Sequence, residues 1–505
     1  MCKEKFHRGG VIVRKSLLDW RFPFGFVALF LGLGAPVALW MNWTDPVVFQ
    51  FFRQPWPSIT VEFFAMGCAA TLFCLPLVWV LSSRVLDLFA FFLAQNALLV
   101  SGYFFLGTTA WRLETFARDI LQNGSLVVAV NALGFAMLFA SMGAIYFLAW
   151  KMQARLPALR ASPEEYDARL TWFLRAAGIG VAFVLCLPMV KTGVIPMLAE
   201  DPVAARTAMQ QSDLQRALYN LGTALMPFVT GGLMLLCTRK PLRIFGPDGW
   251  IVGMILLIQL LSGNRFPLAV AFFVTITLVT VERKWPRPLL VVGYVAFMVL
   301  LTGVSGFTGI LRQDREALEG TNVVAASLEQ AFVGDNLIDT RDAAWVFSQW
   351  DFEPLMGQTY LGGLVSMMPS GIFPQKKQWH LGLTGIRIVG WDPERHFGLR
   401  ITFFGESFLN FGPAGVVGLG FVMGCLFGAL LRVLHLISRK KPPCLHYSLK
   451  TVILMQMCMP LANTSDAFTF WAMGAFVALQ WMCIDLPILY RANRSNEILR
   501  ASSRI

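Results

Sequence analysis

Arginine, histidine and carboxylate side chains gather between residues 387 and 406 of this sequence. The cluster consists of Arg387, Asp392, Glu394, Arg395, His396, Arg400 and Glu406. Transfer of a group onto a hydroxyl requires a base that works near neutral pH and charges that stabilise the leaving anion. We predict that His396, Glu406 and Arg400 are catalytic, with either His396 or Glu406 as the base. The alternatives are a solvated loop with incidental ion pairs and, for Glu406 in the apolar run ITFFGESFLNFG, a structural pairing.

Four further cations have the chemistry to bind a diphosphate. Arg265 lies in the turn SGNRFP (262–267), at the start of a predicted helix whose free N–H groups and dipole favour anions. Arg312 and Arg315 follow a later apolar stretch, and the arginine fork matches phosphate oxygens. Lys376, in FPQKKQW, is either a phosphate contact or a surface charge. The alternatives for the arginines are snorkelling to lipid headgroups and ordinary charges at a helix end.

Aromatic side chains near the cluster have the shape to stack on sugar rings. We predict sugar binding by Tyr360 and Trp391, and the alternative is that they belong to the aromatic belts of a membrane interface. The sequence has no Walker motif, no GxGxxG, no HExxH and no zinc-finger spacing. Its nine cysteines form no CxxC pair, and none lies between 312 and 400. We therefore predict no cofactor, no metal ion, and no disulfide in that interval.

The elements that position these residues are predicted to be membrane helices. Of the 505 residues, 56% are hydrophobic and 14% are charged, whereas soluble domains have about 25% charged residues. About twelve apolar windows are long enough to cross a hydrocarbon core of about 30 Å. They are residues 22–41, 60–81, 87–107, 125–150, 172–196, 218–237, 247–262, 266–282, 288–311, 412–434, 447–463 and 467–490. The predicted fold is an all-α, polytopic integral membrane protein, with residues 1–505 in a single domain.

The charge distribution predicts the orientation of the helices. A net charge of +12 would indicate nucleic-acid binding in a soluble protein, but the positive-inside rule explains it here, so no nucleic-acid partner is predicted. Basic residues accumulate at both ends of the chain and in several connections, which assigns both termini to the cytoplasm. The basic N-terminal segment has no small-residue cleavage site and is predicted to be a retained signal anchor. Residues 312–411 then form an extracytoplasmic loop and membrane re-entry between the ninth and tenth spans.

Two parts of the chain allow sharper structural predictions. Residues 249–281 would be about 50 Å long as one helix. We therefore predict two short helices joined by an outer turn at 262–267, with Pro267 in the first turn of the second helix. In the outer loop, residues 322–333 and 341–350 are predicted to be amphipathic helices.

Three stretches of the sequence carry a family resemblance. They are LSGNRFPL (261–268), GQTYLGGLVSMMPSGIFPQKK (357–377) and ITFFGESFLNFGPAGVVGLGFVMG (401–424). The first is similar to a Gly-x-Arg turn, the second to an outer-loop pattern, and the third to a Glu-x-x-x-Asn-Phe-Gly re-entry. All three are features of bacterial oligosaccharide repeat-unit polymerases, the Wzy-type O-antigen and exopolysaccharide polymerases. The many spans and the single long, late outer loop also resemble that family.

The resemblance implies a glycosyltransferase of the bacterial inner membrane that joins repeat units on undecaprenyl diphosphate at the outer face. Its implied partners are the undecaprenyl-diphosphate-linked oligosaccharide, membrane lipids, a chain-length regulator and a flippase. The leaving group is already a diphosphate, so the resemblance implies no nucleotide. Two alternatives stay open: an O-antigen ligase of related architecture, and a flippase or secondary transporter of lipid-linked sugars. Such transporters have two related halves and central intramembrane charges, whereas the charge here is predicted to lie in the outer loop.

Overall fold

The computed structural model describes somewhat more than half of the chain, and every element in that part is a helix, as the all-α prediction requires. The described residues are 161–199, 213–239, 245–263, 266–283, 340–368, 372–392, 399, 401–439, 444–461, 464, 467–502 and isolated positions within 126–145 and 205–209. The predicted spans 22–41, 60–81, 87–107 and 288–311 and the predicted helix 322–333 lie outside the described residues.

The chain divides into two compact units. Unit 1 comprises Met1–Ser141, Phe332–Gly357 and Leu381–Val422. Unit 2 comprises Met142–Ala331, Gln358–His380 and Met423–Ile505.

In its described part, unit 1 contains two short helices, the beginning of a long one and isolated helical positions between 126 and 141. Its helices are α14 (Thr340–Gln349), α16 (Leu381–Val389) and the first part of α17 (Gly405–Arg439). The first of these confirms the helix predicted at 341–350. α14 packs against α16 through its apolar face, on which Ala343, Val346 and Phe347 are buried.

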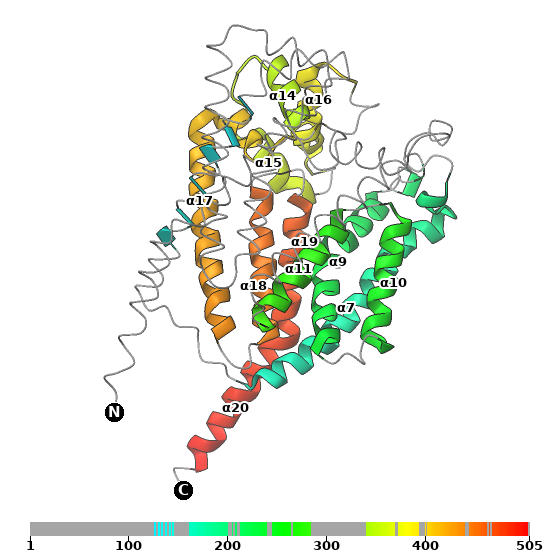
Figure 1. The fold of residues 1–505 in the computed structure, drawn as a ribbon, viewed down its shortest axis with the longest axis vertical. Coiled ribbons are helices and arrows are strands. Elements are labelled where there is room, and N and C mark those ends of the chain that lie inside the picture. The colour runs from blue at the N-terminus through cyan, green and yellow to red at the C-terminus, as the bar shows by residue number, and fades with distance from the viewer. Residues whose placement is uncertain are drawn as a thin grey trace, which may run out of the picture. The chain divides into compact units, whose positions relative to one another are not determined.

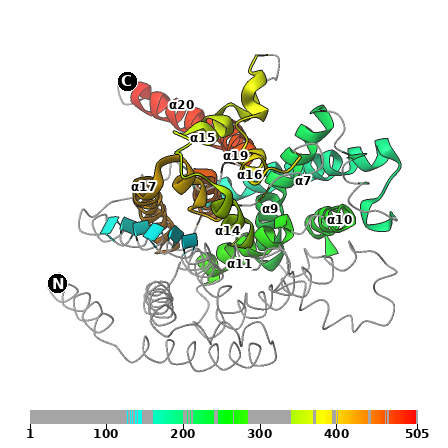
Figure 2. The same cartoon turned by 90° about the horizontal axis from the view of Figure 1, so that it is seen from above.

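Unit 2 is a bundle around one central helix. Its α-helices are α7 (Pro163–Thr192), α9 (Asp213–Arg239), α10 (Pro247–Leu261), α11 (Phe266–Arg283), α15 (Gln358–Leu364), α18 (Leu445–Met457), α19 (Ala467–Gln480), α20 (Leu486–Ser502) and the second part of α17. Shorter turns are η2 (Pro196–Leu198), η5 (Val365–Met367), η6 (Pro374–Lys377), η7 (Met459–Leu461) and the π-helical η9 (Trp481–Asp485). α9 contacts α7, α10, α11, α18 and α19, and Figure 2 shows it between α7, α10 and α11.

Glycines allow α9 to approach its neighbours closely. A Cβ added to Gly231 would lie 2.6 Å from the Val274 side chain of α11, and one added to Gly232 would lie 2.7 Å from the Leu174 side chain of α7. Small residues at helix contacts are typical of membrane bundles, in which van der Waals packing drives association.

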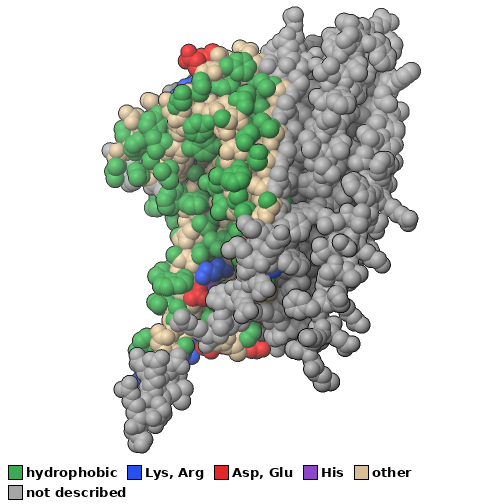
Figure 3. Space-filling model, turned by 90° about the vertical axis from the view of Figure 1, so that its left-hand side faces the viewer, with side chains coloured by type: hydrophobic (Ala, Val, Ile, Leu, Met, Phe, Trp, Pro, Cys, Tyr) green, Lys and Arg blue, Asp and Glu red, His purple; other side chains and the backbone are tan. Residues whose placement is uncertain are grey.

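Among the residues that the structure describes, four helical segments are long and apolar enough to cross a membrane: Pro163–Thr192, Leu214–Thr238, Gly405–Leu434 and Ala467–Arg494. Along α7, Trp172, Ile179, Phe183 and Val190 recur at helical spacing and are between 57% and 75% exposed. A stripe of this kind would be polar on a helix that faced water. On the face shown in Figure 3, the described side chains are predominantly hydrophobic. The chain therefore has the character of a multi-pass membrane protein.

Several helix boundaries differ from the predicted spans for local reasons. α7 begins at Pro163 rather than near 172, because its first turns are charged and therefore fall outside an apolar window. Ser162 caps this turn by accepting a hydrogen bond from the backbone N–H of Glu165 (3.3 Å). α18 ends at Met457, before Pro460, which cannot continue a helix. α20 continues to Ser502, twelve residues past the predicted end at 490.

The predicted break in the 249–281 region is confirmed. α10 ends at Leu261, Gly263 adopts a positive φ of 70°, and α11 starts at Phe266 with Pro267 in its first turn. Glycine suits this turn because it has no Cβ to clash in the left-handed region.

Candidate functional site

The residues predicted to form the site fall into three groups in the structure. Arg265, Arg312, Arg315, His396 and Arg400 lie outside the described residues. The four others are divided between the units, with Glu406 and Trp391 in unit 1 and Tyr360 and Lys376 in unit 2.

Glu406 lies in the first turn of α17 and is completely buried, with 0% of its surface exposed. The first turn of a helix has backbone N–H groups without intrahelical acceptors, and its dipole favours a negative charge. α17 therefore places a carboxylate where the helix itself compensates part of the cost of burial. The predicted span at 412 begins too late, because residues 405–411 already form the first turns of this helix.

A network of uncharged polar groups surrounds the start of α17. The amide nitrogen of Asn131 donates to Thr402 Oγ1 (2.8 Å) and to the carbonyl of Val127 (2.8 Å), while its oxygen accepts from the N–H of Phe404 (3.3 Å). Asn131 and Thr402 are both buried. The backbone N–H of Gly405 then donates to the Thr402 carbonyl (2.9 Å). These bonds fix the segment immediately before Glu406 to a second helical stretch of unit 1.

A kink six residues after Glu406 leaves backbone carbonyls of α17 available to a neighbouring segment. Gly412 has φ 62° and ψ −156°, a conformation that only glycine adopts readily, and Pro413 has no N–H to bond the Leu409 carbonyl. The N–H of Leu355 donates to that carbonyl (3.0 Å), and the N–H of Met356 donates to the Asn410 carbonyl (3.1 Å). The loop that follows α14 therefore replaces hydrogen bonds that the kink removes.

This loop is held in a strained conformation beside α17. Phe352 and Met356 have positive φ values of 64° and 49°, which bulky residues rarely adopt. Aromatic contacts hold it: the Trp350 ring lies 5.0 Å from Phe352 and 5.8 Å from Phe408 of α17, centroid to centroid. The N–H of the Trp350 indole also donates to the Glu353 carbonyl (3.0 Å). Strain of this kind persists only where the surroundings enforce it, and it is frequent at functional sites.

Trp391 is positioned by the end of α16. Gly390 has a positive φ of 77°, its N–H bonds the Arg387 carbonyl (3.0 Å), and the N–H of Trp391 bonds the Ile386 carbonyl (3.0 Å). This is a Schellman cap. The Trp391 ring makes an edge contact with Trp345 of α14, with centroids 4.2 Å apart. One contact surface of the predicted sugar-binding tryptophan is therefore already used within unit 1.

Tyr360 and Lys376 belong to one compact segment of unit 2. Tyr360 is on α15 and is half-buried. Lys376, on η6, donates through Nζ to the Ser366 carbonyl (3.3 Å) and to the Met368 carbonyl. An ammonium has three donors, so these bonds leave one for another acceptor.

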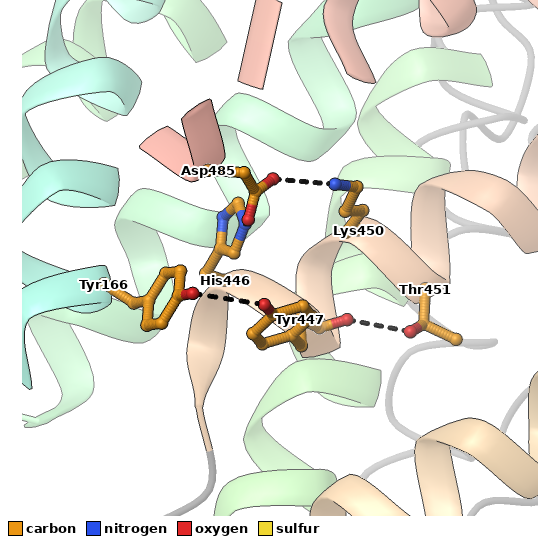
Figure 4. A network of polar contacts seen from close by, with 6 residues as sticks. All are labelled: Tyr166, His446, Tyr447, Lys450, Thr451 and Asp485. Carbon is orange, nitrogen blue, oxygen red and sulfur yellow. Dashed lines mark hydrogen bonds and ion pairs between the residues drawn. The ribbon is translucent and has the colours of Figure 1, made fainter. Parts of the chain in front are cut away.

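Unit 2 also contains an ionic network that the sequence did not lead us to predict (Figure 4). Lys450 Nζ donates to Asp485 Oδ2 (2.8 Å), and His446 Nε2 lies 3.1 Å from Asp485 Oδ1. His446 and Lys450 are one turn apart on α18 and therefore share a face. Asp485 is the last residue of the π-helical turn η9, in which backbone hydrogen bonds join residues five positions apart instead of four. Together these groups join α18 to the helix that continues into α20.

Two tyrosines enclose the histidine of this network. The Tyr166 ring of α7 stacks on the His446 ring, with centroids 5.5 Å apart and an interplanar angle of 14°. The Tyr447 hydroxyl donates to the Tyr166 hydroxyl (3.4 Å), and Thr451 Oγ1 donates to the Tyr447 carbonyl (2.8 Å). His446 is fully buried as a result.

A second ion pair, between a half-buried arginine and a buried aspartate, joins α7 to α10. Arg175 Nε lies 2.5 Å from Asp248 Oδ1, and its terminal nitrogen donates to Oδ2 (3.2 Å). Asp248 is fully buried in the first turn of α10. Charged groups are thus buried among the apolar helices, so the prediction that the charge lies in the outer loop was incomplete. A single charged residue changes the mean hydropathy of a predicted span only slightly, so the sequence windows did not reveal these residues.

The two groups of unit 2 lie at opposite ends of α19 and its continuation. α15 and η5 contact α19, which begins at Ala467, and Figure 1 shows them near that end. Asp485 is eighteen residues later, which is about 27 Å along a helix. The ionic network is therefore too far from Tyr360 and Lys376 to share a substrate atom with them. Within the described ranges, His, Cys, Asp and Glu side chains form no group of three or more that could hold a metal ion.

Comparisons with known proteins give no relative. No family model, curated protein or solved structure matches the chain. A function for it is therefore argued from its residues and their geometry.

Proposed function

We propose that this chain is a membrane glycosyltransferase that polymerises polyprenyl-diphosphate-linked oligosaccharide repeat units at the outer face of the bacterial inner membrane. The observation that carries the proposal is the fully buried Glu406 at the start of a membrane-length helix. It lies in the stretch that resembles the Glu-x-x-x-Asn-Phe-Gly re-entry of Wzy-type polymerases. About twelve spans, cytoplasmic termini and an extracytoplasmic loop at 312–411 belong to the same proposal.

In the proposed reaction, the growing chain is the donor and an incoming lipid-linked unit is the acceptor. Glu406 or His396 removes the proton from a hydroxyl of the acceptor sugar, whose oxygen attacks the anomeric carbon of the donor. A new glycosidic bond forms while the bond from that carbon to the lipid diphosphate breaks. Arg265, Arg312, Arg315 and Arg400 hold the diphosphate and stabilise the charge that it acquires on leaving.

The geometry supports Glu406 as a reacting group in two ways. Glu406 is fully buried in the first turn of α17, where the helix dipole favours a negative charge, and Asn131 and Thr402 fix the segment that precedes it. The kink at Gly412 and the strained loop 351–357, which bonds the backbone next to the kink, give unit 1 a specific backbone arrangement beside the first turns of α17. Neither feature is expected of a helix that only crosses lipid.

Polymer length in cells that depend on this chain tests the proposal. We expect Arg265→Ala to abolish high-polymer ladders while the protein is still inserted in the membrane at its normal level. Undiminished ladders in that variant would remove Arg265 from the diphosphate site. A deletion strain separates polymerase from ligase, because loss of a polymerase leaves single repeat units attached whereas loss of a ligase leaves none.

The buried ion pairs favour a second candidate, a secondary transporter or flippase of anionic lipid-linked sugars. Ionisable groups within spans frequently belong to ion or proton pathways. Asp485 lies inside the candidate span Ala467–Arg494, and Asp248 lies in the first turn of the shorter apolar helix α10. Reconstitution of the purified protein with lipid-linked repeat units in vesicles without any ion gradient distinguishes the two. Longer products support the polymerase, and movement of unchanged units across the bilayer supports the transporter.

A further inference from the structure

The segment from α15 to η6 begins with a helix that exposes its leucines and buries small and polar residues, which is the reverse of a helix that faces water. The buried face of α15 consists of Thr359, Gly362 and Gly363, whereas Leu361 and Leu364 are 43% and 59% exposed. A surface helix in water buries its leucines and exposes its small and polar residues. The reverse order indicates that the outer surroundings of α15 are apolar.

The buried face of α15 is packed so closely that the helix cannot rotate about its axis to bury its leucines instead. A Cβ on Gly362 would lie 2.5 Å from the carbonyl oxygen of Trp379, and one on Gly363 would lie 2.7 Å from the Thr464 Cβ and 3.2 Å from the Ala467 Cβ. Thr464 also donates through its hydroxyl to the Thr359 carbonyl (3.3 Å). The exposed leucines therefore stay outside.

These contacts place the segment at one end of a membrane-length helix. Ala467 is the first residue of the candidate span Ala467–Arg494. α15 and η5 both contact the helix that starts there. They consequently lie at the depth where the hydrocarbon of a bilayer meets the headgroups.

The rest of the segment has the composition of a membrane interface. Met368 and Ile372 are 46% and 71% exposed, which extends the apolar surface beyond α15. The rings of Phe373 and Trp379 make an edge contact at 5.2 Å, and aromatic residues concentrate at headgroup depth. The ammonium of Lys376 bonds the carbonyls at the end of η5, where the backbone would otherwise expose them to lipid.

We propose that the α15–η6 segment is inserted into the surface of the bilayer, with Leu361, Leu364, Met368 and Ile372 against lipid hydrocarbon. The lipid is favoured over a protein partner because the segment contacts the end of a candidate span, and because other spans of the same unit, such as α7, also expose an apolar stripe. The inference does not depend on the reaction that the chain catalyses.

Photo-crosslinking in vesicles tests the insertion. The full chain carries p-benzoylphenylalanine in place of Leu364, Ile372 or the exposed, polar Gln375 as a matched control on η6. The vesicles contain phosphatidylethanolamine and phosphatidylglycerol, and lipid adducts are identified by mass spectrometry of the labelled peptide. We expect about tenfold more lipid adduct at positions 364 and 372 than at 375, because contact with hydrocarbon follows the apolar face.

Two outcomes would overturn the proposal. One is an equal yield of lipid adduct at all three positions, in variants whose elution profile matches the wild type. The other is a crosslinked dimer at position 364 in place of the lipid adduct, which would show that a second copy of the chain covers this face. Both readouts are independent of catalysis, so a failure here leaves the proposed glycosyltransferase untouched.

Discussion

The two units bury a carboxylate in different ways. Asp485 in unit 2 has a lysine on one oxygen and a histidine on the other, both from α18. Glu406 in unit 1 lies in the first turn of α17, next to a network of amide and hydroxyl groups centred on Asn131 and Thr402. The charge of Asp485 is balanced by side chains of a neighbouring helix, whereas Glu406 lies at a helix terminus that favours a negative charge.

This difference separates a structural from a chemical use of a buried acid. A carboxylate bonded on both oxygens to side chains of a neighbouring helix fastens two helices, and it loses that role when it gives up either partner. A buried carboxylate in the first turn of a helix, followed by a kink and beside a strained loop, lies in surroundings of the kind that are frequent at functional sites. We therefore propose that the chemistry takes place in unit 1 and that the ionic network of unit 2 serves helix packing.

The largest expected effect is on catalysis, from Glu406→Gln. The amide keeps the volume and hydrogen-bonding capacity of the side chain but cannot act as a base, so we expect polymerisation to fall about 10²- to 10⁴-fold with little change in thermal stability. The measurement is the chain-length distribution that purified protein forms from lipid-linked repeat units.

Glu353→Gln is the matched control, because Glu353 is an exposed carboxylate in the same unit. It should polymerise at the wild-type rate. If Glu406→Gln does so too, Glu406 is a structural residue, His396 becomes the candidate base, and the contrast between the two carboxylates loses its chemical meaning.

The next effect is on stability, from Asp485→Leu. This change leaves Lys450 partly buried without its carboxylate, which we expect to cost about 3–5 kcal/mol of unfolding free energy. Thermal unfolding of the detergent-solubilised protein measures the loss. The double variant Asp485→Leu with Lys450→Met removes both charges and should recover most of it.

The double variant also tests the assignment of this network to packing. Its polymerisation rate at low temperature should match that of the wild type. A variant that is stable but inactive, or that loses ion-coupled movement of lipid-linked units, would show that the network takes part in function and would favour the transporter.

The sequence predicts the helices better than it predicts these two groups. Periodicity and proline placement predict α10, α11 and α14 to within about two residues, since local composition determines where a helix starts and ends. Asn131 and Thr402 are 271 positions apart and meet only through the fold. A single sequence carries no signal for such a pair.

The sequence contains a signal for the ionic network, but averaging hydropathy over a window of residues removes it. His446 and Lys450 are four residues apart near one end of a predicted span, and Asp485 lies inside another. Each ionisable residue in an apolar run indicates a buried partner. Their pairing still required the structure, because the π-helical turn η9 alters the face on which Asp485 lies.

A smaller effect is expected from Gly412→Ala, which strains the kink after Glu406. The glycine has φ 62° and ψ −156°, so an alanine costs about 1–3 kcal/mol although no atom lies within 4 Å of the added Cβ. Gly418→Ala is the control on the same helix, where the added Cβ also meets nothing and φ is not positive. It should be neutral or slightly stabilising, since alanine is the better helix former. Equal losses of thermal stability in the two variants would refute the requirement for the kink.

The smallest effect on stability is expected from Thr402→Val, which removes one hydrogen bond of unit 1. Valine fills the same space but leaves one buried N–H of Asn131 without its acceptor, which we expect to cost about 1 kcal/mol. Thr402→Ser keeps the hydroxyl and loses only a methyl group, so it should retain more stability if the hydrogen bond dominates. If serine is instead the worse of the two, packing at this site outweighs the hydrogen bond. The polar network would then be a consequence of how α17 begins and not its cause.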